Sequence, residues 1–130
     1  MTARVTPEPG ARPVVVLISV TWAGPSRPAP TVLRELSRRW GREIRAVLLE
    51  DPDDEVLDQL EIELVPTWVR LEAPHSDAVP RPGTVRDLEI SGTGLDGQGL
   101  FLTGAWLETH RRTGALPKHV IDTEFGPRGL

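Results

Sequence analysis

Cysteine is absent from this sequence of 130 residues. Without a thiol the chain cannot form a disulfide, hold a metal through thiolates or carry out dithiol–disulfide exchange as written. The same absence removes disulfides as a guide to the redox state of the protein's compartment. Any activity must therefore use other side chains, or the chain must act by binding.

Long apolar segments are also lacking. The apolar run over residues 14–20 is too short to cross a bilayer, and residues 1–12 have no apolar centre of the kind found in signal peptides. We therefore expect a cytoplasmic protein that does not bind a membrane. The net charge of −4 argues against nucleic acid as a partner, because phosphate binding depends on clustered cations.

Metal-binding and phosphate-binding motifs are missing as well. The histidines at positions 75, 110 and 119 do not have the spacing of zinc ligands. The glycines at positions 92, 94, 97 and 99 do not open a helix after a buried strand, as those of a phosphate-binding loop do. We expect neither a metal nor a cofactor.

The patterns that are present predict an α/β domain. Apolar runs predict strands over residues 14–20, 43–50 and 65–71, the first two of them buried. Alternation of apolar and polar residues predicts a half-exposed strand over residues 85–90. Apolar residues at helical spacing predict helices over residues 32–40, 51–60 and 103–113, the second capped by Asp51 and the third by Thr103. This order predicts a central mixed sheet of four strands flanked by helices.

The expected domain covers residues 14–114. Residues 1–13, rich in proline, glycine and threonine, are expected to be a flexible N-terminal segment, and residues 115–130 a C-terminal extension. The extension contains four large apolar residues, whose exposure to water would be costly, so we expect it to pack across the domain or against a second copy. These residues are Leu116, Val120, Ile121 and Phe125.

Two short motifs in this arrangement resemble the thioredoxin family. The first, Trp22-Ala23-Gly24-Pro25-Ser26, follows a buried strand and opens a helix where the family has W-C-G-P-C. The second, Val65-Pro66-Thr67, is similar to the family's cis-proline segment and begins a strand at about the family's usual distance from the first. The chain is therefore identified as thioredoxin-like over residues 13–92, with Ala23 and Ser26 at the two redox positions.

Two further positions depart from the family pattern. Leu17 stands where thioredoxins bury a proton-relaying aspartate, and Pro30 lies one residue earlier than the family's helix proline. The catalytic pair and its proton relay are thus absent together, so we assign no catalytic residue. Ser26 is interpreted as a residue that satisfies backbone N–H groups at a helix start. A serine nucleophile would need an approaching base, for which His75, His110 and His119 are the candidates.

The resemblance implies a surface for binding an extended protein segment. In the family, the backbone of the residue before the cis-proline pairs with a partner chain as in a sheet, and here that residue is Val65. We expect it to lie in a shallow apolar face with the neighbouring turns. The predicted peptide-binding residues are Trp22, Gly24, Pro25, Val65, Pro66 and Gly92.

Two functions remain open at this point. One is a redox-inactive module, an adaptor or chaperone-like protein, that binds a protein or peptide partner. The other is a thioredoxin-type disulfide reductase whose cysteines at positions 23 and 26 have been substituted, which cysteine codons at those positions would reveal. A non-redox enzyme using Ser26 is a third, weaker hypothesis. The partner and the oligomeric state do not follow from the sequence.

Overall fold

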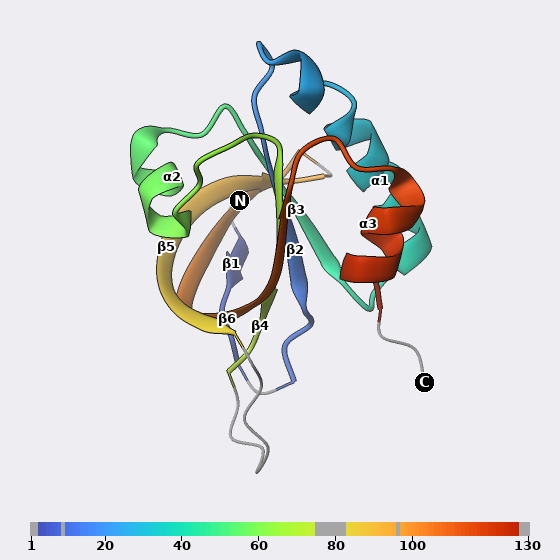
Figure 1. Cartoon of the computed structure of the whole chain (residues 1–130). Coiled ribbons are helices and arrows are strands. Elements are labelled where there is room, and N and C mark those ends of the chain that lie inside the picture. The colour runs from blue at the N-terminus through green and yellow to red at the C-terminus, as the bar shows by residue number, and fades with distance from the viewer. Residues whose placement is uncertain (1–2, 9, 75–82, 96, 128–130) are drawn as a thin grey trace.

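The fold is built around β2 (Val14–Ser19), a strand whose six residues are all buried. The computed structural model describes residues 3–8, 10–74, 83–95 and 97–127 (Figure 1). The other elements in chain order are β1 (Ala3–Val5), the 3-10 helix η1 (Gly24–Ser26), α1 (Ala29–Trp40), β3 (Arg45–Glu50), α2 (Asp54–Leu60), β4 (Thr67–Glu72), β5 (Thr84–Gly94), β6 (Gly99–Thr113) and α3 (Lys118–Phe125).

The sheet has six strands, in the order β1-β6-β4-β2-β3-β5. Strands β2 and β3, joined through α1, are parallel, and β4 is antiparallel to β2. Strand β5 pairs with β6 along most of its length and also reaches β3, so the sheet closes on itself. The expectation of four strands is thus corrected, because β1 and β6 add to the four.

Alternate residues of β2 face two separate hydrophobic clusters. Val14, Val16 and Ile18 face the inside of the curved sheet, where the hairpin covers them with Leu88 and Trp106. The intervening residues face the other way, against α1 and α3. This division follows from the period of two in a strand, and it explains why β2 reads as a continuous apolar run.

The helix expected over residues 103–113 is wrong, because this segment belongs to β6. Leu100, Leu102 and Trp106 are buried at even positions, as in a strand. The segment is held by ladders to β4 and β5, and a helix here would leave β4 unpaired on one side and β5 paired only at its end with β3. Glu108 and Arg112, which would face each other one turn apart on a helix, do not pair, and Arg112 bonds Glu124 on α3. Long-range strand pairing overrides the local helical spacing here.

The helix expected from residue 51 begins later than predicted. Asp53, not Asp51, caps α2, and its side chain accepts a hydrogen bond from the backbone N–H of Val56 at 3.1 Å. Asp51 has a φ of 50° and lies outside the helix. Its carboxylate is therefore available for another role, described below.

The C-terminal segment contributes a helix to the core. Ile121 and Phe125 of α3 are fully buried against the sheet, and the ring of Phe125 lies 6.4 Å from that of Trp68. The buried Arg70 donates hydrogen bonds to the backbone carbonyls of Phe125 and Gly126, where α3 ends. The expectation that the large apolar residues of this segment pack across the domain is confirmed for these two.

The N-terminal segment also takes part in the sheet. Residues Ala3–Val5 form β1, which pairs in parallel with Leu100–Leu102 of β6, and Val5 is buried. Nowhere in the described ranges is there a helix with both the length and the apolar character needed to cross a membrane.

Candidate functional site

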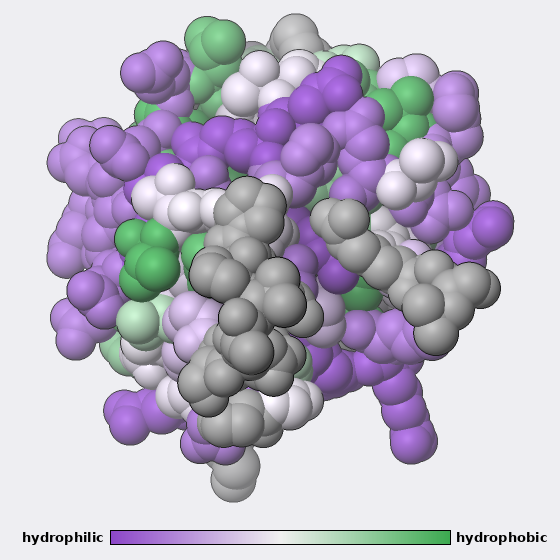
Figure 2. Space-filling model, turned by 60° about the horizontal axis from the view of Figure 1, so that its bottom comes forward, coloured by the Kyte–Doolittle hydropathy of each residue, from purple (hydrophilic) through white to green (hydrophobic). Residues whose placement is uncertain are grey.

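Trp22 is the most exposed large apolar side chain in the described part of the protein, with 76% of its surface accessible. It lies in the turn between β2 and η1, at the upper end of the molecule in Figure 1. The opposite end comes forward in Figure 2, where hydrophilic side chains dominate and apolar ones form small separate patches. The turn at Trp22 therefore stands out as a place where an aromatic side chain is presented to solvent.

Ser26 has a structural role in this turn. It is fully buried, and its Oγ accepts a hydrogen bond from the backbone N–H of Val20 at 3.2 Å. Its carbonyl oxygen accepts a second bond from the hydroxyl of Ser19, also at 3.2 Å. These contacts tie η1 to the end of β2. The backbone N–H that Ser26 satisfies is thus that of Val20 at the end of the strand, and not one at a helix start as expected.

No histidine in the described part of the chain activates Ser26. His110 is engaged elsewhere: its Nε2 lies 2.6 Å from a carboxylate oxygen of Glu124, and its ring packs 4.9 Å from that of Phe125. His119 is exposed on α3, and His75 lies outside the described residues. The arrangement does not support a serine nucleophile.

Asp51 fixes the position of the turn from the neighbouring strand. Its two carboxylate oxygens accept hydrogen bonds from the backbone N–H and the hydroxyl of Thr21, at 2.9 and 2.8 Å. Its own N–H donates to the carbonyl of Ser19 at 2.8 Å. Because Thr21 directly precedes Trp22, this two-point contact fixes the backbone from which the exposed indole projects. The sequence does not reveal this role, because an aspartate followed by a proline and two further aspartates is typical of a helix N-cap.

The second part of the site precedes β4. The Val65–Pro66 peptide bond is cis, and the carbonyl of Pro66 accepts a hydrogen bond from the N–H of Gly114 at 2.8 Å. The hydroxyl of Thr67 donates to the carbonyl of Leu64 at 2.5 Å. Within the described residues, the N–H and C=O of Val65 have no hydrogen-bond partner. The half-buried Val65 therefore offers a backbone N–H and a backbone C=O that a partner chain could bind.

The sheet register brings the two parts together. Strands β2 and β4 are antiparallel, with Ile18 opposite Thr67. The chain leaving β2 toward Trp22 therefore lies at the same sheet end as the chain entering β4 from Val65. Leu64, with 64% of its surface accessible, adds a second exposed apolar side chain that the sequence reasoning did not single out.

The remaining predicted residues divide between this site and another place. Gly24 and Pro25 form η1 beside Trp22, and space is open around the Cα of Gly24. Gly92 instead pairs with Leu100 of β6 and backs onto β3, where an added Cβ would come within 2.4 Å of Leu49. Gly114, which follows β6, is the glycine that donates a hydrogen bond to the cis-proline segment. It is distant in sequence from β4 because the long β5–β6 hairpin lies between them.

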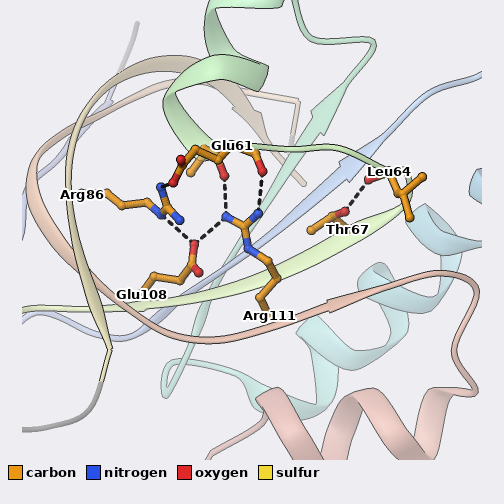
Figure 3. A network of polar contacts seen from close by, with 7 residues as sticks. Glu61, Leu64, Thr67, Arg86, Glu108 and Arg111 are labelled. Carbon is orange, nitrogen blue, oxygen red and sulfur yellow. Dashed lines mark hydrogen bonds and ion pairs between the residues drawn. The ribbon is translucent and has the colours of Figure 1, made fainter.

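A network of four charged side chains anchors the segment that leads to Val65 (Figure 3). Arg111 of β6 donates to the backbone carbonyls of Leu60 and Glu61, where α2 ends, the latter at 2.9 Å. Glu108 accepts from Arg111 at 2.6 Å and from Arg86 of β5 at 2.8 Å. Arg86 in turn donates to the carboxylate of Glu61 at 2.6 Å. The hydrogen bond from Arg86 and its charge lower the pKa of Glu61.

The network has a positional consequence for the site. Residue 61 has a φ of 51°, which turns the chain out of α2 toward Leu64. Cationic groups on the terminal carbonyls of a helix complement its negative end. The exposed segment before the cis-proline is thus held at one end by charged side chains and at the other by Gly114.

No three histidine, aspartate or glutamate side chains gather into a possible metal site in the described ranges.

Comparison with known proteins gives matches in structure only. No protein-family model matches the sequence, and no curated protein matches it. Mitochondrial thioredoxin 3 from Saccharomyces cerevisiae, in its oxidised form, superposes with a TM-score of 0.53 at 16% identity, covering 94% of this chain and 92% of that one. Oxidised thioredoxin O2 from Arabidopsis thaliana gives 0.52 at 14% identity, covering 95% and 96%.

The chain has a thioredoxin fold. The germline-specific thioredoxin Deadhead from Drosophila melanogaster adds a third match, with a TM-score of 0.52 at 16% identity over 86% of this chain and 76% of that one. At these identities the likeness establishes the fold and leaves the activity to be argued from the site. The two positions at which the resemblance would place redox cysteines hold Ala23 and Ser26, and no cysteine is present anywhere in the sequence.

Proposed function

We propose that this thioredoxin-fold chain is a redox-inactive binding module that takes up an extended segment of a protein partner, as an adaptor or chaperone-like protein. The observation that carries the proposal is the free backbone of Val65, which lies beside the cis-proline at the same end of the sheet as the exposed Trp22. An extended chain added there would gain two main-chain hydrogen bonds. Trp22 and Leu64 would supply its apolar contacts.

The chemistry of the turn supports binding without catalysis. A methyl group at Ala23 cannot act as a nucleophile, and the hydroxyl of Ser26 is buried and bonded to the backbone. Leu17, where a proton relay would be needed, is buried in the apolar cluster beneath α1. A partner would therefore be held and released by non-covalent contacts. We place this activity in the cytoplasm, a location that fractionation of cells would check.

A disulfide reductase with substituted cysteines is the second candidate. It is favoured by one observation: positions 23 and 26 keep the turn–helix geometry, with Ser26 buried at the helix side and Ala23 partly accessible. Cysteine codons at these positions would establish this candidate. Leu17 argues against it, because replacing two cysteines for study does not explain a buried leucine at the relay position.

The binding proposal can be tested with the full chain and a permanently unfolded protein that contains no tryptophan, reduced and carboxymethylated ribonuclease A, as the probe. Trp22 is the one exposed indole, since Trp40, Trp68 and Trp106 are buried, so acrylamide quenching reports on this turn. We expect the probe to protect Trp22 from quenching.

Two variants sharpen the measurement. Leu64→Asp is expected to weaken binding of the probe about tenfold by removing one apolar anchor, whereas Arg34→Ala on the exposed side of α1 should leave it unchanged. If the probe leaves quenching of Trp22 unaltered at saturating concentrations, or binds the Leu64→Asp variant as well as the native chain, the proposal is wrong.

A further inference from the structure

A second strand edge lies away from the cis-proline site. In Figure 1, β5 forms the outer rim of the sheet beneath α2. It pairs with β6 from Thr84 to Thr93, but it meets β3 only at Thr93 and Gly94. The earlier part of β5 therefore has a neighbouring strand on one side alone.

The side chain of Gln59 shows which backbone groups of β5 point outward. The N–H of Glu89 donates to Oε1 of Gln59 at 2.8 Å, and Nε2 of Gln59 donates to the carbonyl of Glu89 at 3.2 Å. Both groups of Glu89 therefore face away from β6. Along an antiparallel ladder, successive residues point their N–H and C=O groups alternately toward and away from the paired strand. Val85 and Asp87, which are four and two residues before Glu89, therefore also point these groups away from β6.

These outward groups form an open edge. Within the described residues, neither Val85 nor Asp87 has a hydrogen-bond partner on the side away from β6. Val85 is 58% exposed, a third prominent apolar side chain besides the two at the cis-proline site. Exposed strand edges are usually covered or blocked, so an edge left open beside an exposed valine is a place for a strand to add.

The carboxamide of Gln59 occupies the position of one peptide group of such a strand. It makes the donor–acceptor pair that an added strand would make with Glu89. Next to it lies a hollow of about 360 Å³, lined in part by Asp87, Thr103 and Gly104. An incoming chain would continue the row of hydrogen bonds from Gln59 toward Val85 and place side chains against this hollow.

The charge around the edge selects the kind of occupant. Asp87 and Glu89 are exposed and have no ion-pair partner in the described part of the chain. Two copies of this edge would bring like charges together, which disfavours self-pairing. Lysine or arginine side chains flanking an added strand would meet the two carboxylates instead.

We propose that the β5 edge at Val85–Asp87 is a second binding site, which takes an extended segment carrying lysine or arginine by strand addition. The site is separate from the cis-proline surface in both position and charge requirement. The chain would thus hold two extended segments, or two stretches of one partner.

The test uses the full chain and a short, capped, fluorescein-labelled peptide of alternating lysine and valine, with a glutamate–valine peptide as its counterpart. Titration by fluorescence anisotropy should show binding of the lysine peptide at least about tenfold tighter than that of the glutamate peptide. Hydrogen exchange should show the amides of Val85 and Asp87 protected only when the lysine peptide is present.

Asp87→Pro is the decisive variant. It removes the outward N–H without removing a hydrogen bond to β6, as proline does on natural edge strands. We expect an affinity loss of about tenfold, the equivalent of one or two hydrogen bonds. Asp87→Asn should cause a smaller loss, and Trp22→Ala none.

Several results would overturn the proposal. These are equal binding by the Asp87→Pro variant, no protection of the Val85 and Asp87 amides by the lysine peptide, equal affinity for both peptides, or loss of binding in Trp22→Ala. Protection of these amides in the concentrated chain without peptide would assign the edge to a second copy instead. The exchange measurement on the native chain decides the matter even where Asp87→Pro does not fold.

Discussion

The interface between α3 and the sheet contrasts with the surface around Trp22. At the first, apolar side chains are buried and several polar groups are paired: Phe125 is enclosed, and Trp40 donates to Asp122 at 2.8 Å. The exception is Nε1 of Trp68, which is buried without a hydrogen-bond partner in the described part of the chain. At the second, Trp22 and Leu64 are exposed and the backbone of Val65 has no partner in the described part of the chain. The first region stabilises the molecule, whereas the second leaves groups open that only a partner would satisfy.

The largest effect that would separate the two regions is expected from truncating the aromatic ring of α3. Phe125→Ala removes a fully buried ring that contacts Trp68 and His110. We expect a loss of about 3–5 kcal/mol in the free energy of unfolding, measured by urea denaturation. The matched variant Trp22→Ala should change it by less than about 0.5 kcal/mol. A similar loss in both variants would show that the exposed indole also supports the fold.

A smaller effect is expected from the clamp beneath Trp22. Asp51→Ala removes two hydrogen bonds to Thr21 and should cost about 1–2 kcal/mol. It should also loosen the indole, seen as lower fluorescence anisotropy and weaker binding of the unfolded probe. The matched control is Asp53→Ala, which removes the cap of α2 at about 1 kcal/mol and should leave the indole signal unchanged. Equal changes in both signals would contradict a positioning role for Asp51.

The smallest effect concerns the rim of the α3 interface at acid pH. The hydrogen bond with His110, reinforced by Arg112, lowers the pKa of Glu124 despite the opposing effect of desolvation. A lowered folded-state pKa gives stability that is complete above the unfolded value of about 4.3 and is lost as the pH falls through the folded value. The stability difference between the native chain and Glu124→Gln should therefore shrink as the pH is lowered from about 5.5 to 3. A difference that stays constant over this range would contradict the assignment.

The parts of the fold that sequence reasoning predicted are those specified by local signals. The strands around Val16, Val47 and Val69 read correctly because each is a continuous buried run. The Trp22 turn and the Val65–Pro66 segment were predicted because they carry distinctive residues at a distinctive distance. From these the thioredoxin fold followed.

The misassigned parts depend on contacts that are distant in sequence. Trp106 and Leu107 have helical spacing, and only the ladders to β4 and β5 make them part of a strand. Gly92 was predicted to lie beside the cis-proline segment because a helix at 103–113 made 85–90 the last strand, whereas in the structure Gly114 after β6 bonds Pro66. The role of Asp51 depends on a hydrogen bond to Thr21, which no spacing rule anticipates.

The pairing of β1 with β6 also bears on how the protein folds as it is synthesised. Ala3 pairs with Leu100, so β1 leaves the ribosome well before β6, the strand with which it pairs. Pairings this distant carry a large loop-closure entropy, which slows folding relative to chains with local contacts. During that interval Val5 and the inner face of β2 have no cover from the hairpin, and a nascent chain would be exposed to aggregation until β6 emerges.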